Sequence, residues 1–124
     1  MYGLFGRGEV RNLTPQEVAD GLATGRILLV DVREPHETAR ERIRGASLVP
    51  LSRLDPLELP DPEGREVVFT CASGVRSMKA AEIAQAAGLA YDAQLAGGIT
   101  AWKAAGLPVE GRADEPDGPG SRGR

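Results

Sequence analysis

The sequence predicts an α/β fold, in which helices cover a parallel β-sheet. Segments typical of strands and of helices alternate along the chain and are joined by short loops. Residues 27–30 form a continuous aliphatic run, as expected of a strand that is buried on both faces of a sheet. With 124 residues, 41% of them hydrophobic, the chain is long enough for one domain with its own core.

Local signals predict the individual helices and strands. Thr14 and Glu17 form a capping box around Pro15, so a helix begins there and ends at Gly21 or Gly25. Further helices are expected at 36–42, 77–87 and 99–105, strands at 27–30, 47–49, 67–70 and 91–95, and a proline-containing loop at 55–64.

The composition divides the chain into three parts. All the expected helices and strands lie in residues 9–109, which we predict to be the folded domain. Residues 1–8 are rich in glycine and are expected to be loose. Residues 110–124 contain four glycines, seven charged residues and a single hydrophobic residue, Ala113, so we predict a disordered charged tail.

Charge and cysteine content argue against several classes of function. The net charge of −3 gives no basic surface for nucleic acid or anionic membranes. A single cysteine rules out an internal disulfide and a Cys-rich zinc site, and we expect no metal or cofactor. The first ten residues lack the apolar stretch of a signal peptide, and no apolar run is long enough to span a membrane. We therefore expect a cytoplasmic protein.

The clearest chemical signal lies in the loop after the strand predicted at 67–70. Cys71 follows this strand directly, at the end of the sheet where ligand sites of open α/β folds gather. Ala72, Ser73 and Gly74 are small enough for the backbone to curl around the sulfur with its N–H groups pointing inward. Together with the following helix N-terminus and a nearby arginine, these groups are expected to lower the pKa of the cysteine.

Three motifs resemble those of single-domain rhodanese sulfurtransferases. The loop Cys71-Ala72-Ser73-Gly74-Val75-Arg76-Ser77 resembles their active-site loop. Residues 31–35, Asp-Val-Arg-Glu-Pro, resemble the motif after their first core strand, and residues 97–102 resemble their late Gly-Gly-x-x-x-Trp segment. The resemblance covers residues 9–109 and implies a rhodanese-like open parallel sheet of about five strands with helices on both faces.

The resemblance also implies an activity. Cys71 would be the catalytic nucleophile of a thiosulfate-type sulfurtransferase, taking sulfane sulfur from a donor such as thiosulfate to form a persulfide. A thiol or cyanide would then accept the sulfur. The expected substrate-binding residues are Ala72, Ser73, Gly74, Val75 and Arg76. Within the loop only Arg76 carries side-chain charge, and we expect the donor's anionic oxygens to approach it.

Five further residues are expected to support the loop: Asp31, Arg33, Ser77, Gly97 and Gly98. Asp31 and Arg33 would cap loop N–H groups or pair with neighbours. The two glycines would allow another segment of backbone to approach the loop closely. His36, the only histidine, lies in a polar stretch and is expected to face solvent rather than to act as a base.

Two alternatives are considered. The first is a phosphatase or arsenate reductase, and the loop length argues against it: related enzymes of these kinds have five residues between cysteine and arginine, whereas four lie between Cys71 and Arg76. The second alternative is a non-catalytic rhodanese-like module that carries sulfur for, or docks onto, a thioredoxin-like or sulfur-relay protein. One departure from the family pattern is Arg42, which stands where members often have histidine and is expected to affect local packing rather than the nucleophile.

Overall fold

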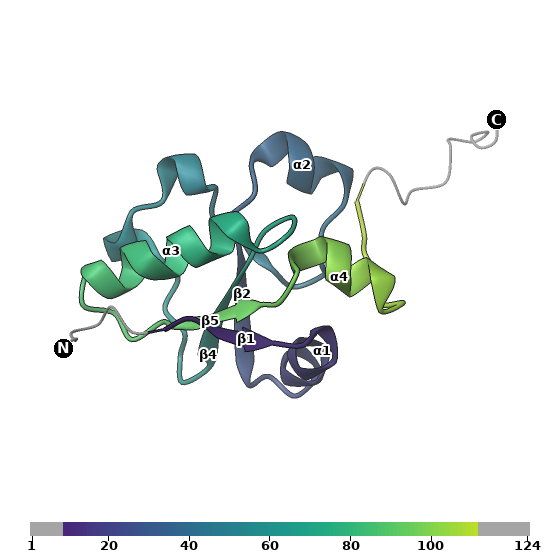
Figure 1. Cartoon of the computed structure of the whole chain (residues 1–124), viewed down its shortest axis with the longest axis horizontal. Helices are drawn as coiled ribbons and strands as arrows, with labels where there is room; N and C mark the ends of the chain where they lie inside the picture. Colours follow the sequence, from purple (N-terminus) through teal and green to yellow (C-terminus); the bar gives the residue numbers. More distant parts are fainter. Residues whose placement is uncertain (1–8, 112–124) are drawn as a thin grey trace.

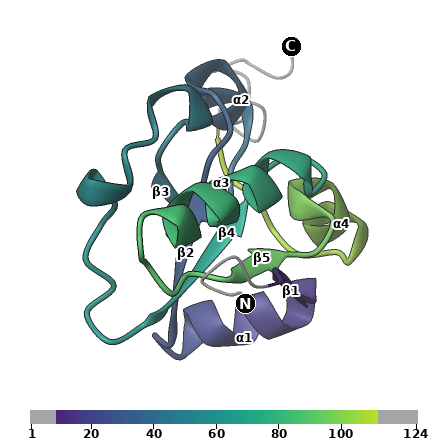
Figure 2. The same ribbon diagram turned by 60° about the vertical axis from the view of Figure 1, so that its left-hand side comes forward.

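The computed structural model describes residues 9–111, in which one parallel five-stranded sheet lies between helices (Figures 1 and 2). The strand order is β1-β5-β4-β2-β3. The strands are β1 (Arg11–Leu13), β2 (Ile27–Asp31), β3 (Ser47–Leu48), β4 (Glu66–Thr70) and β5 (Ala93–Leu95). The helices are α1 (Pro15–Ala23), α2 (Pro35–Arg40), α3 (Val75–Ala86) and α4 (Gly98–Ala104), with short 3-10 helices at Leu51–Arg53 and Pro56–Glu58. The predicted α/β fold is confirmed.

Two apolar clusters pack on opposite faces of the sheet. Ile27 and Leu29 of β2 belong to the cluster under α1 and α4, whereas Leu28 and Val30 belong to the cluster under α3. Figure 2 shows α1 and α3 on opposite sides of the sheet. Trp102 of α4 is buried in the first cluster, while α3 contributes three buried alanines to the second. Small side chains allow α3, which follows the Cys71 loop, to lie close against the sheet.

The observed elements differ from the expected ones mainly at their ends. The capping box of Thr14 and Glu17 forms as predicted and starts α1. Helix α3 begins at Val75 rather than Ser77, because Gly74 adopts the left-handed conformation, with φ of 110°, just before it. Strand β1 was not expected individually, because its three residues, Arg-Asn-Leu, show no apolar alternation and lie at the edge of the sheet.

The first residue of the expected tail pairs with the domain. The backbone groups of Glu110 and Arg42 exchange two hydrogen bonds of 2.7 and 2.8 Å, and the Glu110 carboxylate lies 3.1 Å from the Arg44 guanidinium. The remaining tail, residues 112–124, and the segment 1–8 lie outside the described residues. None of the helices within residues 9–111 is both long and apolar enough to cross a membrane.

A buried ion pair closes the turn between β2 and α2. Arg33 Nη2 lies 2.8 Å from Asp31 Oδ2, and the two side chains are only 4% and 1% exposed. Arg33 also donates to the carbonyl oxygen of Glu41 at 2.9 Å, and Asp31 accepts a hydrogen bond from the backbone N–H of Arg33 at 3.0 Å. The pair thus ties the end of β2 to both ends of the α2 segment.

Replacing Arg33 with methionine should lower the free energy of unfolding by about 3–5 kcal/mol, because the Asp31 carboxylate would be buried without its counter-ion. The double variant Asp31→Asn with Arg33→Met carries neither charge, and its asparagine can still accept the backbone hydrogen bond. It should therefore lose clearly less stability. Urea unfolding followed by circular dichroism measures both losses, and equal losses would contradict this account of the pair.

Candidate active site

The loop between β4 and α3 surrounds the sulfur of Cys71 with hydrogen-bond donors. The backbone N–H groups of Gly74 and Ser77 each lie 3.2 Å from Cys71 Sγ. The Ser77 hydroxyl oxygen lies 3.4 Å from the same sulfur and accepts a hydrogen bond from it when Cys71 is a neutral thiol. Cys71 itself is only 1% exposed. The structure therefore brings Cys71, Gly74 and Ser77 together, as a cradle for negative charge on sulfur requires.

Hydrogen bonds outweigh burial in setting the pKa of Cys71. Burial raises the pKa of the thiol, because a thiolate is poorly solvated inside the protein. The Ser77 hydroxyl and the backbone N–H groups of Ser77, Gly74 and Ser73 stabilise the thiolate, and the net effect lowers the pKa below its ordinary value. Such a cysteine is a nucleophile that needs no adjacent general base. His36 is exposed on α2, as expected.

The first turn of α4 holds the loop in this orientation. The N–H groups of Ile99 and Thr100 donate to the carbonyl oxygens of Cys71 and Ala72 at 2.9 and 3.1 Å. Because these carbonyl groups point toward α4, the loop can turn its later N–H groups toward the sulfur. A side chain at Gly98 would collide with this arrangement, since its Cβ would lie 2.4 Å from the carbonyl oxygen of Cys71. The close backbone approach expected of the glycine pair is thus present.

Arg76 is bound to α2 rather than left as a free charge beside the sulfur. Its Nη1 and Nη2 atoms lie 2.7 and 2.9 Å from the two carboxylate oxygens of Glu37. The hydrogen bond from Arg76 lowers the pKa of Glu37 to about 2, so the pair remains ionised at neutral pH. Sequence reasoning missed the pairing of Glu37 with Arg76. The sequence shows only that Glu37 lies three residues after Glu34, the spacing at which its carboxylate accepts from the backbone N–H of Glu34.

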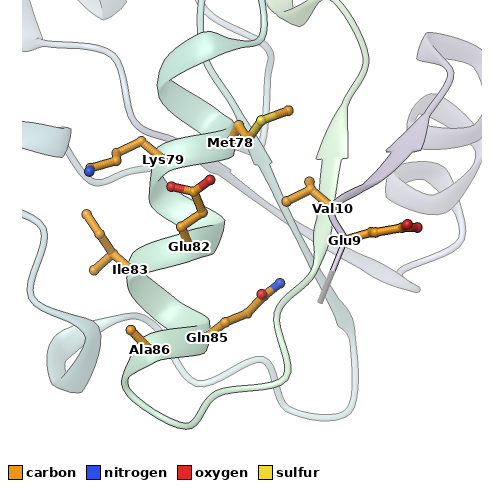
Figure 3. A pocket seen from close by; sticks show the side chains of 8 residues that line it. All are labelled: Glu9, Val10, Met78, Lys79, Glu82, Ile83, Gln85 and Ala86. Atoms are coloured by element: carbon orange, nitrogen blue, oxygen red, sulfur yellow. The ribbon is translucent and has the colours of Figure 1, made fainter. Parts of the chain in front are cut away.

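The site is separate from the hollow that runs along α3. This hollow, of about 610 Å³, lies between Met78 and Glu82 of α3 and the residues Glu9 and Val10 before β1 (Figure 3). Cys71 is not among the residues that line it. Within residues 9–111, no three histidine, cysteine, aspartate or glutamate side chains gather as metal ligands would.

Comparison with known proteins agrees with the loop and the sheet. The family model of the rhodanese-like domain matches residues 14–105. The chain belongs to the rhodanese-like domain family. This confirms the resemblance drawn from the loop, from residues 31–35 and from the glycine pair.

The rhodanese-like domain has relatives of known and unknown activity. It is 39% identical to a sulfurtransferase of Allochromatium vinosum over 95 residues, which cover 76% of this chain and 85% of that protein. It is 47% identical over 83 residues to an uncharacterized protein of Synechocystis, covering 67% of this chain but only 46% of that protein. A rhodanese-like domain protein of Staphylococcus aureus has a similar structure, with a TM-score of 0.64, 30% identity, and 75% and 91% of the two chains covered.

Replacing Gly98 with alanine should displace the loop from the sulfur. The added Cβ would meet the carbonyl oxygens of Cys71 and Ala72 at 2.4 and 2.6 Å, at a residue with φ of 61°. We expect the free energy of unfolding to fall by about 2 kcal/mol or more and alkylation of Cys71 by iodoacetamide to slow.

Gly106→Ala is the matched control, because Gly106 has φ of 81° but no atom within 4 Å of the added Cβ. This variant should lose about 1 kcal/mol from backbone strain and keep the alkylation rate of wild type. Equal losses of stability and reactivity in the two variants would show that the approach of α4 to the loop is unimportant.

Proposed function

We propose that this rhodanese-like domain is a sulfurtransferase that carries sulfane sulfur as a persulfide on Cys71. The main support is the sulfur itself, which is buried and accepts hydrogen bonds from the backbone N–H groups of Gly74 and Ser77. Both the thiolate and a persulfide are anions that such donors stabilise. The sulfurtransferase relative in Allochromatium vinosum is consistent with this chemistry.

The proposed reaction has two steps with thiosulfate as donor. The Cys71 thiolate attacks the outer sulfur of thiosulfate, the bond between its two sulfur atoms breaks, and sulfite leaves with the electron pair. The terminal sulfur of the new persulfide carries the negative charge and takes over hydrogen bonds from the loop. An acceptor thiolate or cyanide then attacks that terminal sulfur, and the Cys71 thiolate leaves with its electron pair, which restores the starting protein.

A sulfur carrier that serves a protein partner is the second candidate. Val75, the first residue of α3, is 77% exposed, and Met78 about one turn further along the same helix is 41% exposed. An apolar rim beside a buried sulfur suits contact with another protein, such as a thioredoxin-like or sulfur-relay protein. In this version the second step would require the partner's thiolate and would be slow with small acceptors.

Mass spectrometry of the intact protein should show one added sulfur atom after incubation with excess thiosulfate, and cyanide should remove it. Cys71→Ser should gain nothing, because a hydroxyl group does not form the persulfide at neutral pH. Absence of any gain with both thiosulfate and inorganic polysulfide would overturn the proposal. If a sulfur atom is added but neither small thiols nor cyanide remove it, the result would instead indicate a sulfur carrier that serves a protein partner.

Weakening the hold of Glu37 on Arg76 should improve the use of thiosulfate. Glu37→Gln keeps an oxygen that can accept from the backbone of Glu34 but removes the negative charge from Arg76. We expect kcat/KM for thiosulfate to rise by about fivefold, corresponding to about 1 kcal/mol for a partly exposed pair.

Glu41→Gln provides the control for this change, because Glu41 is bound to Lys103 and not to Arg76. Its kcat/KM should match that of wild type. A fall in kcat/KM for Glu37→Gln would contradict this expectation and would mean that the pair is needed to hold the loop.

A further inference from the structure

A row of hydrogen bonds leads from Cys71 to the surface of the domain. Ser77 Oγ lies 3.4 Å from Cys71 Sγ and 2.5 Å from Gln94 Oε1. The Nε2 group of Gln94 donates to Asn12 Oδ1 at 2.7 Å. Cys71, Ser77 and Gln94 are buried, whereas Asn12 is exposed. The reactive sulfur is thus linked through two buried side chains to an amide in contact with solvent.

The topology of the sheet brings these residues together. β1 and β5 pair in parallel with Asn12 directly beside Gln94, and Gln94 lies beside Phe69 of β4. Ser77 stands in the first turn of α3, which packs over this face of the sheet. A buried amide costs free energy unless its groups are hydrogen-bonded, and Gln94 finds its partners in Ser77 and Asn12.

The hydroxyl of Ser77 has a single proton and two neighbouring acceptors. With Gln94 Oε1 at 2.5 Å, that proton goes to Gln94, and Ser77 Oγ can only accept the proton of the thiol. This direction suits the neutral thiol. When Cys71 is a thiolate, the hydroxyl must donate to the sulfur, and two oxygen atoms would face each other with no proton between them.

A half-turn of both amide groups removes this conflict. The Nε2 group of Gln94 then donates to Ser77 Oγ, and the Nδ2 group of Asn12 donates to Gln94 Oε1, because each amide carries both a donor and an acceptor. Every hydrogen bond of the row is kept, but its direction is reversed. Asn12 can follow because its amide is exposed and is not bound to one orientation by the interior.

We propose that Gln94 and Asn12 are positioning residues that act through Ser77, and that their hydrogen-bond row reverses its direction when Cys71 loses its proton. The orientation of the side-chain amide at residue 12 then sets the direction of the row, which favours either the thiol or the thiolate of Cys71. The inference concerns the free thiol and does not rest on the proposed sulfur transfer.

The charged groups beside the Cys71 loop are held in ion pairs, and further charged groups lie near Asn12. Beside the loop, Arg76 pairs with Glu37, near Glu34, and Arg33 pairs with Asp31. No residue of β5 is charged, and neither are Gly97 and Gly98 at the start of α4. The charged groups on the elements beside Asn12 are Arg11, Glu66 and Asp92, which form one ion-pair network, and Glu9, Lys79 and Glu82, which line the hollow of Figure 3.

The test is the rate of alkylation of Cys71 by iodoacetamide as a function of pH, in the full chain without any sulfur donor. The wild-type midpoint should lie below the ordinary thiol value of about 8.5. Asn12→Asp supplies only acceptors at neutral pH, so it holds Gln94 Nε2 toward residue 12 and Oε1 toward Ser77. We expect this variant to raise the midpoint by about one pH unit, which is about a tenfold loss of thiolate below the midpoint.

A double-variant comparison separates the row from the charge of the new aspartate. Gln94→Met interrupts the row, so adding Asn12→Asp to it should shift the midpoint by less than about a third of the shift seen alone. Ser77→Ala interrupts the row at its other end and should suppress the shift in the same way, which keeps the test available if Gln94→Met does not fold.

Equal shifts with and without an intact row would overturn the proposal, because the charge of Asp would then act through space alone. The absence of any shift for Asn12→Asp would overturn it as well. If the protein shows the expected shifts but gains no sulfur from thiosulfate, the hydrogen-bond row is supported and the proposed function is not. The two failures are therefore distinguishable.

Discussion

The site depends on two carbonyl groups that point away from the sulfur. Cys71 and Ala72 direct their carbonyl oxygens to the N–H groups at the start of α4, which have no partner within their own helix. These two hydrogen bonds satisfy both the loop carbonyl groups and the helix N–H groups. They leave the loop free to present its later N–H groups to Cys71. The strand order places β5 beside β4, so α4 starts next to the loop, and Gly98 permits the contact.

Charge around the site is largely compensated within the protein. Arg76 is matched by Glu37, and Arg33 is matched by Asp31 in the turn that carries α2 toward the loop. The thiolate is therefore stabilised mainly by hydrogen-bond donors at fixed positions rather than by a free cation. The backbone donors are fixed in place beside a buried sulfur, where dissolved ions screen them little. Their stabilisation of the thiolate should therefore persist as the ionic strength changes.

Sequence reasoning reached the parts of this site that are local in the chain. The strand–Cys71–glycine pattern, the capping box at Thr14 and the glycine pair at the start of α4 each lie within a few residues, and each was predicted. The pairing of Arg76 with Glu37, 39 residues earlier, was not. Gln94 and Asn12, 82 residues apart, meet because β1 and β5 are neighbours. Such contacts depend on strand order and register, which a single sequence does not specify.

The burial of Cys71 has a consequence for which atom of a persulfide reacts. A nucleophile that attacked the inner sulfur would expel hydrosulfide and leave a mixed disulfide joined to the protein. The inner sulfur is enclosed by the loop and the start of α3, and only 1% of the residue is exposed. Of the two sulfur atoms, the outer one would be the more accessible to an acceptor, so attack there would be sterically favoured. If the proposed persulfide forms, this enclosure would act as regiochemical control: it would direct the acceptor to sulfur transfer and protect the protein from covalent trapping.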